Sequence, residues 1–312
     1  MRIHGISLVK NEVDIISQTL AAAAIWCDFI YVLDNGSTDG TWEKVLEISA
    51  SNEKIIPYKQ DSKPFFDGMR GEIFNRYKEN SEGGDWWCRL DADEFYIDDP
   101  RIFLSKISSN YNFACSASFG FYFTEKDLEL YKQDKSFYSD EVMVEKKIRY
   151  YSSKWSEIRC VKHTKNFVWP LEEGWPISGG SVYPVRIWTK NYRYRSPDQI
   201  QRRIDTRREA MRRGKFIHEL ASHETWKARS SILPTKTLHK DNTISPDDLS
   251  WKDRVADSKS LSLYEFDGKF LCNEEYMPSI QSIENYINKS QSPGKKTKKV
   301  GLRRPFKALR QR

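Results

Sequence analysis

Two aspartates separated by one residue, Asp91 and Asp93, are the first candidates for chemistry in this sequence. They follow the apolar run Trp86–Leu90, which has the composition of a buried strand. Alternate side chains of an extended chain point the same way, so both carboxylates can face one ligand. Mg²⁺ and Mn²⁺ bind such hard oxygen ligands together with substrate phosphates. The pattern predicts a site for Mn²⁺ or Mg²⁺ and a diphosphate; the alternative is a solvated acidic turn.

Alternating strands and helices would position these aspartates. Apolar runs predict strands at residues 3–9, 29–33, 55–58 and 86–90, and apolar spacing predicts helices at 11–24, 41–49 and 68–80. This order is typical of an α/β fold with a Rossmann-like, mostly parallel sheet and flanking helices. Ligands of such sheets bind at the carboxyl ends of the strands. We therefore expect Asp34, which follows the second strand, to share one edge with Asp91.

The pattern is weaker after residue 100. Strands are predicted at 114–123, 142–151 and 181–189, and helices at 198–213 and 279–288, whereas residues 226–271 have no clear period. The chain is predicted to consist of an α/β domain at 1–225, a C-terminal helical or irregular extension packed on it at 226–290, and a basic, disordered tail at 291–312.

Charge is concentrated in that tail. The chain of 312 residues has a net charge of +7, but nine of its 51 Lys and Arg residues lie in 291–312, which leaves 42 against 44 acidic residues. A nucleic-acid-binding surface over the whole chain is therefore not expected, and nucleic acid is not predicted as a partner. The five cysteines form no CxxC pair, which favours reduced thiols in a cytoplasmic protein. The tail predicts peripheral binding to an anionic membrane surface at the inner face; a solubilising tail is the alternative.

Four blocks of the sequence together resemble family 2-type glycosyltransferases with the GT-A fold. They are Ile6–Glu12, Leu33–Thr41, Arg70 and Leu90–Phe95. They occur in the family's order, at about its spacing, within residues 1–100. The segment 192–208 resembles members that build bacterial surface polysaccharides. The resemblance implies that residues 1–225 are a GT-A domain. It also implies inverting transfer of a sugar from a nucleotide-diphosphate donor, typically a UDP-sugar, to a glycan or lipid-linked acceptor.

The resemblance also implies roles for individual residues. The nucleotide-sugar site would consist of Val9, Lys10, Asn11, Glu12, Asp34, Arg70, Asp91, Ala92 and Asp93. Asp34 would accept a hydrogen bond from the base, and Arg70 would lie near the nucleotide or diphosphate. Asp91 would contact the ribose or the metal, and Asp93 would be the main metal ligand.

A general base must remove the acceptor's proton in an inverting transfer. In this family it is an acid well after the metal motif, and the candidates here are Glu157, Glu172 and Glu173, of which Glu173 is preferred. Some members place a metal-binding histidine late in the domain. Asn191 stands at that position here, which leaves His218 and His223 as candidates or as ordinary hydrogen-bonding histidines.

Two other functions stay open. A sugar nucleotidylyltransferase usually has a Gly-rich basic loop after its first strand, and the sequence Lys10-Asn11-Glu12 contains no glycine. A non-enzymatic membrane or nucleic-acid binding module would depend on the basic tail, and the near-neutral remainder of the chain disfavours it. Residues 193–215 hold nine basic and three acidic residues, which indicate either a wall for a diphosphate or a solvated helix face.

Overall fold

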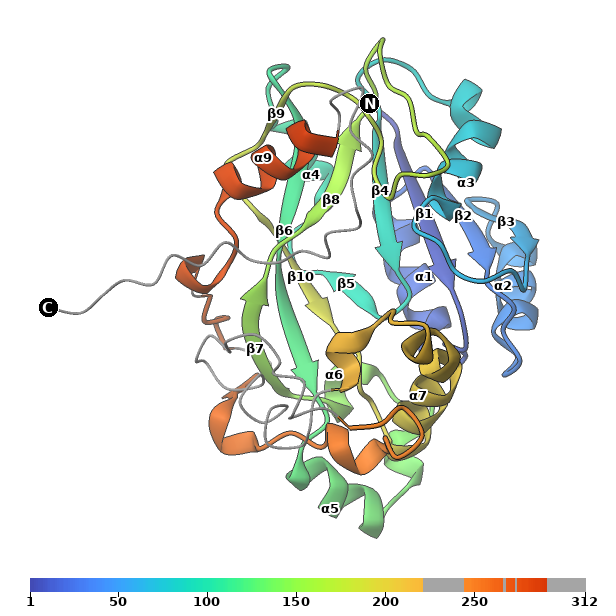
Figure 1. Ribbon diagram of the computed structural model, residues 1–312, viewed down its shortest axis with the longest axis vertical. Coiled ribbons are helices and arrows are strands. Elements are labelled where there is room, and N and C mark those ends of the chain that lie inside the picture. The colour runs from blue at the N-terminus through green and yellow to red at the C-terminus, as the bar shows by residue number, and fades with distance from the viewer. Residues whose placement is uncertain (221–243, 266–267, 273, 291–312) are drawn as a thin grey trace, which may run out of the picture.

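The computed structural model describes residues 1–220, 244–265, 268–272 and 274–290. Within these ranges, helices flank a curled sheet (Figure 1). The strands are β1 (Ile3–Val9), β2 (Phe29–Asp34), β3 (Ile55–Gln60), β4 (Trp86–Asp91), β5 (Glu94–Tyr96), β6 (Tyr111–Tyr122), β7 (Tyr150–Trp155), β8 (Ile158–Lys162), β9 (Ser181–Val182), β10 (Ile187–Asn191) and β11 (Ser262–Leu263). The helices are α1 (Ile16–Trp26), α2 (Thr41–Ser51), α3 (Met69–Tyr77), α4 (Pro100–Ser105), α5 (Glu125–Gln133), α6 (Val144–Lys147), α7 (Pro197–Arg212) and α9 (Ile280–Ser290).

The sheet has the order β11-β7-β6-β8-β4-β1-β2-β3, and the strands lie side by side from β3 to β7 in Figure 1. β3, β2, β1 and β4 are mutually parallel, as the alternation of strands and helices predicts. Beyond β4 the sheet becomes mixed, because β8 pairs antiparallel with both β4 and β6. The predicted α/β class with flanking helices is confirmed.

The two faces of the sheet are covered by different helices. Alternate residues of β4 show this, since Cys88 and Leu90 pack in a cluster with α1 and α2, whereas Trp87 packs in a second cluster with α3 and α9. A third cluster joins the lower half of β6 to α5, α6 and α7. The described helices are too short or too polar to cross a bilayer.

The described part of the predicted extension packs on the sheet. β11 pairs antiparallel with β7, and Ile283 and Ile287 of α9 are buried in the cluster with α3. The proposed boundary at 225/226 and the tail 291–312 lie outside the described residues.

Some predicted elements differ from the structure. The helix predicted from residue 11 begins at Ile16, because Asn11 has a φ of 56° that ends the strand in a tight turn. The strand predicted at 142–151 is instead the helical turn α6 followed by β7. Val144 and Ile148 are four residues apart, so one helical turn buries both. The strand predicted at 181–189 is divided into β9 and β10.

The buried His4 should make the fold sensitive to acid. Its ring stacks on Trp87 with centroids 4.5 Å apart, and burial lowers its pKa from 6.5 to about 4 although Asp85 opposes the shift. The unfolded chain binds this proton near pH 6.5 and the folded chain near pH 4, so stability falls as the pH falls between these values. We expect a loss of about 3 kcal/mol from this group, measured by urea unfolding at pH 7.5 and 4.5. In His4→Phe the pH dependence should shrink by about that amount; an unchanged dependence would contradict the assignment.

Candidate active site

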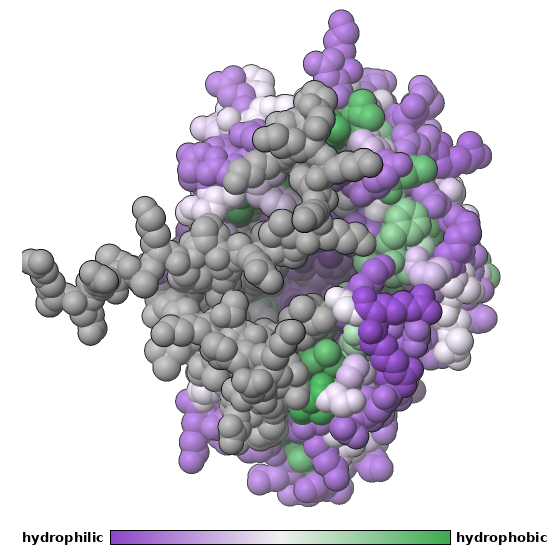
Figure 2. Space-filling model, viewed as in Figure 1, coloured by the Kyte–Doolittle hydropathy of each residue, from purple (hydrophilic) through white to green (hydrophobic). Residues whose placement is uncertain are grey.

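Two acidic strand ends lie at one edge of the sheet, on either side of the end of β1. β1 lies between β2 and β4, and the parallel registers pair Val9 with Asp34 and Leu8 with Asp91. Asp34 and Asp91 are therefore two strands apart, or roughly 10 Å at the usual strand spacing. Figure 2 shows a hollow with a hydrophilic floor near the centre of this face, over the ends of β4 and β5 in Figure 1. The predicted convergence of Asp34 and Asp91 at one edge is thus present.

Asp34 is fully buried and has one carboxylate oxygen without a donor. Its Oδ1 accepts hydrogen bonds from the Ser37 N–H at 2.7 Å and from Gln60 Nε2 at 3.2 Å. Its Oδ2 is buried and has no hydrogen-bond partner among the residues that the structure describes. An unsatisfied buried acceptor costs about 1–3 kcal/mol, so a ligand N–H that reached this oxygen would be stabilised there.

The turn after β1 is held by its own side chains. The Asn11 N–H donates to Ser37 Oγ at 2.9 Å, the Thr38 N–H donates to Asn11 Oδ1 at 2.8 Å, and Asn11 Nδ2 donates to Thr206 Oγ1 at 2.8 Å. Asn11 thereby joins the turns after β1 and β2 to α7. Lys10 lines an open depression of about 600 Å³ between these turns and α7.

Glu12 and Val9 are buried beside this turn and make internal contacts. Val9 packs in the cluster with α1. The carboxylate of Glu12 accepts from Arg195 Nη2 at 2.6 Å, and burial raises the pKa of Glu12 although Arg195 opposes the shift. Both residues therefore support the end of β1 from within the protein.

Asp91 lies among three arginines. Its Oδ1 accepts from Arg70 Nη2 and from Arg89 Nε, both at 3.1 Å, and its Oδ2 accepts from Arg159 Nη1 at 2.7 Å. Burial opposes ionisation, but the arginines hold the pKa of Asp91 well below its usual value. We call this group the arginine cluster; it comprises Arg70, Arg89 and Arg159 with Asp91, Glu94 and Glu157.

Asp93 is buried but less fully engaged than Asp91. Its Oδ1 accepts from Asn191 Nδ2 at 3.1 Å, and its Oδ2 lies 3.6 Å from Arg203 Nη1 in an ion pair. Asn191 is the residue that stands where the resemblance leads one to look for histidine, and the structure places it against the predicted metal ligand. Ala92 is buried in the α1 cluster between the two aspartates.

The two aspartates differ in how well they fit a divalent cation. Both oxygens of Asp91 are occupied by arginines, whereas Asp93 Oδ2 accepts no hydrogen bond from a described residue. Within the described ranges no group of three or more His, Cys, Asp and Glu side chains could hold a metal. Mg²⁺ is commonly held by one or two carboxylates and substrate phosphates, so Asp93 fits as a single protein ligand. His223 and the side chain of His218 lie outside the described part of the chain.

The three predicted bases have separate locations. Glu157 belongs to the arginine cluster, where its Oε1 accepts from Arg159 Nη2 at 2.8 Å. Burial opposes ionisation, but Arg159 and Arg89 lower the pKa of Glu157, which keeps it ionised. Glu172 is exposed on the loop after β8. Glu173 lies on the same loop, near enough to Tyr286 of α9 that its charge adds to burial in raising the pKa of that tyrosine. The structure therefore brings Glu157 to Asp91, and it places the preferred Glu173 beside α9.

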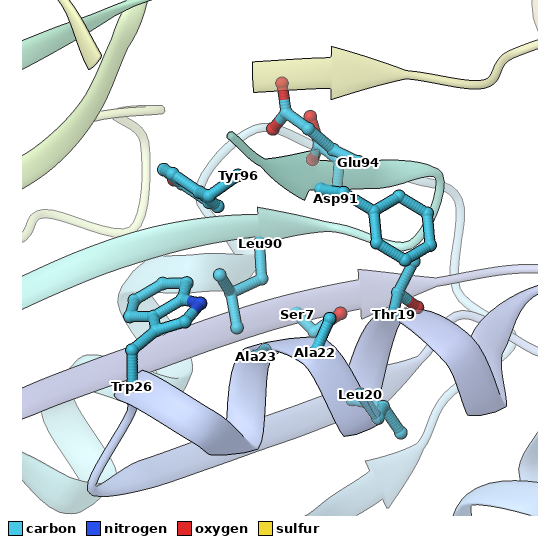
Figure 3. A pocket seen from close by; sticks show the side chains of 11 residues that line it. Ser7, Thr19, Leu20, Ala22, Ala23, Trp26, Leu90, Asp91, Glu94 and Tyr96 are labelled. Carbon is cyan, nitrogen blue, oxygen red and sulfur yellow. The ribbon is translucent and has the colours of Figure 1, made fainter. Parts of the chain in front are cut away.

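Glu94 is a further acid at this edge that sequence reasoning did not single out. Its Oε1 accepts from Arg159 Nη2 and Thr189 Oγ1, both at 2.9 Å, and no described residue donates a hydrogen bond to its Oε2. Burial raises its pKa to about 8. A cavity of about 20 Å³, room for about one water, lies between it and α1. Figure 3 shows the carboxylates of Asp91 and Glu94 together, on the side away from α1. In the sequence, the place of Glu94 directly after Asp93 is the one signal that points to it.

The basic stretch on α7 is largely neutralised by acids. Arg195 binds Asp14 through Nε at 2.7 Å as well as Glu12, and Arg203 lies within 4 Å of Asp93, Glu12 and Glu219. Ion pairs therefore hold α7 against this edge of the sheet and neutralise much of its charge.

Comparison with models of known protein families gives no match, and comparison with curated proteins gives none. Among solved structures, the chain is similar to S. aureus TarS (residues 1–349), with 17% identity and a TM-score of 0.28. The match covers 38% of this chain and 35% of that one, and a complex of the same protein with UDP matches equally. It is also similar to the mannosyltransferase PcManGT from Pyrobaculum calidifontis in complex with GDP-Man and Mn²⁺, with 15% identity, a TM-score of 0.30 and coverage of 52% and 44%. Similarities this limited do not establish a shared activity.

Proposed function

We propose that this chain is a glycosyltransferase that uses a nucleotide-diphosphate sugar. The observation that carries the proposal is the buried Oδ2 of Asp34, an acceptor without a donor at the edge that also holds Asp91 and Asp93. A nucleobase N–H would satisfy this oxygen. The diphosphate would then lie across the end of β1 towards Asp93. The sequence blocks that resemble GT-A enzymes support the same reading.

The proposed reaction joins the sugar to an acceptor hydroxyl. The hydroxyl oxygen attacks the anomeric carbon, the bond from this carbon to the diphosphate oxygen breaks, and its electron pair leaves with the nucleoside diphosphate. The hydroxyl proton passes to a carboxylate, for which Glu157 is the best-placed candidate because it is ionised and partly exposed beside Asp91. A single displacement of this kind inverts the anomeric centre; inversion rests on the sequence resemblance.

Charge on the leaving diphosphate needs neutralisation. A Mn²⁺ or Mg²⁺ bound to Asp93 would supply Lewis-acid stabilisation. Arg70 is buried against Asp91, and its buried Nε has no hydrogen-bond partner in the described part of the chain, so it would add a donor from the chain itself. The sequence supplies the rest of the proposal. The donor is a UDP-sugar, the acceptor belongs to surface-polysaccharide synthesis, and the tail 291–312 contacts an anionic membrane.

Nucleotide binding tests this proposal through Asp34. UDP with Mn²⁺ should stabilise the protein by about 2.7 kcal/mol at 100 times Kd, seen as a raised Tm. Asp34→Asn puts a donor where an acceptor is needed. It should weaken UDP binding by about 10- to 100-fold, since hydrogen bonds to charged groups contribute about 1.5–3 kcal/mol.

Asp28→Asn is the matched control, because Asp28 lies just before β2 at its opposite end. It should leave UDP binding unchanged. Indifference of the wild type to both UDP and GDP, each with Mn²⁺, would contradict the proposal and favour a non-enzymatic binding module.

A further inference from the structure

Trp155, at the end of β7, is unusually exposed for a tryptophan. Its exposed fraction is 37%, whereas Trp86, Trp87 and Trp169 are at most 3% exposed. Its side chain is nevertheless not free on the surface, since the indole lies close enough to the Glu157 carboxylate to help lower the pKa of that group. The indole is thus held in place while a large part of it stays open to solvent.

A second tryptophan lies on the other side of the same charged pair. The guanidinium of Arg89 lies 5.8 Å from the ring centroid of Trp175, and Arg89 Nη1 lies 3.5 Å from Glu157 Oε2. Successive contacts therefore join Trp175 to Arg89, Arg89 to Glu157, and Glu157 to Trp155. We call these four residues the tryptophan strip.

The strip forms the accessible side of the arginine cluster. The side chains of Arg89 and Glu157 are 25% and 24% exposed, whereas those of Arg159 and Glu94 are 2% and 1% exposed. The buried ion pairs therefore fix the position of two charged groups that solvent, and hence a ligand, can reach.

The strip also lies on the appropriate side of the proposed nucleotide site. In the sheet, β8 and β7 lie on the side of β4 opposite to β1 and β2. A nucleotide with its base at Asp34 and its diphosphate at Asp93 would direct the transferred sugar towards β8. An acceptor would then approach from the strip.

Indole rings and a paired cation and anion suit one class of ligand. Aromatic faces pack against the apolar C–H face of a pyranose, and indole is large and rigid. The guanidinium donates hydrogen bonds to ring hydroxyls and the carboxylate accepts them. The strip holds one positive and one negative group, so it has no excess charge to attract an ionic ligand. These properties favour a neutral saccharide over an anionic or purely apolar one.

We propose that the tryptophan strip is the acceptor subsite and binds a neutral pyranoside with one hydroxyl against Glu157. This inference rests on the proposed function and names the acceptor's chemical class and the residues that hold it. The indoles position the acceptor, and Glu157 receives the proton in the reaction described above.

Saturation-transfer NMR on the full chain tests this subsite with defined probes. The probes are methyl glucoside, methyl galactoside, methyl mannoside, cellobiose and lactose, each titrated in the presence of UDP and Mn²⁺. At least one should bind the wild type. Trp155→Ala and Trp175→Ala should each weaken it by about 10-fold or more, the loss of one stacked aromatic contact of about 1.5 kcal/mol. Trp155→Phe should keep most of the binding, because it keeps the aromatic face.

Trp251→Ala is the control, since Trp251 packs in the separate cluster around α7. It should leave saccharide binding unchanged, and Trp155→Ala should leave UDP binding unchanged. Absence of binding by every probe, or equal binding by the wild type and both alanine variants, would overturn the subsite. Saccharide binding that depends on the strip, in a chain that binds no nucleotide, would keep the subsite and remove the transferase.

Discussion

Asp93→Asn should lower the rate of transfer from a nucleotide sugar by about 10²–10³-fold, the usual effect of removing one group that stabilises developing charge. Asp93 is the aspartate of the pair whose Oδ2, within the described ranges, makes an ion pair with Arg203 at 3.6 Å and accepts no hydrogen bond. Asparagine keeps the bond from Asn191 at Oδ1 and loses the charge that a cation would need. The measurement is release of UDP from UDP-sugars with and without acceptor.

Chelation provides the sharper comparison for this variant. If Asp93 acts through a metal, EDTA should slow the wild type by a similar factor and slow Asp93→Asn little further, because groups that act as a unit are not additive. Glu129→Gln, at an exposed position of α5, should behave as the wild type. A wild-type rate in Asp93→Asn would sink the assignment.

Arg159→Met should destabilise the protein by about 3–5 kcal/mol, the usual effect of removing one partner from a buried ion pair. The Arg159 guanidinium is 2% exposed and binds Asp91, Glu94 and Glu157 within 2.9 Å. Methionine fills a similar volume, but it removes the positive charge that these three acidic side chains share. Urea unfolding measures the change, and Arg212→Met, exposed on α7, should stay within about 0.5 kcal/mol of the wild type.

The pH dependence of Arg159→Met gives an independent check. Buried carboxylates that lose their cation have folded-state pKa values above their unfolded values, so the folded variant binds more protons than the unfolded chain. Its stability then falls as the pH rises, and the deficit should be larger at pH 8 than at pH 5. A deficit independent of pH would point to lost packing instead.

The first ninety residues were predictable because their signals are local. Each strand is an apolar run ended by a turn, and in the turn before α2 the Asp39 carboxylate accepts a hydrogen bond from the Thr41 N–H at 3.1 Å. Parallel pairing then brings Asp34 and Asp91 to one edge without further information.

The side-chain contacts within the site were less predictable, because they join residues that lie far apart in the sequence. Arg159 on β8 meets Asp91 from 68 positions away, and Arg203 on α7 meets Asp93 from further still. Neither arginine carries a local mark that separates it from a surface residue. Glu173 is the preferred base in the sequence, and its loop lies near Tyr286 of α9 and, through Trp175, near Arg89. Glu157 instead meets the arginine cluster through the pairing of β8 with β4, which the sequence does not reveal.

Gly68, just before α3, is in very close contact with the loop that carries Trp175. A Cβ at position 68 would lie 1.6 Å from the Leu171 carbonyl oxygen, so any larger residue must displace the loop. α3 also carries Arg70, which binds Asp91. α3 and the loop that carries Trp175 are therefore packed directly against each other at this glycine. A loop redesigned with other side chains would keep this packing against α3 only while residue 68 remains glycine.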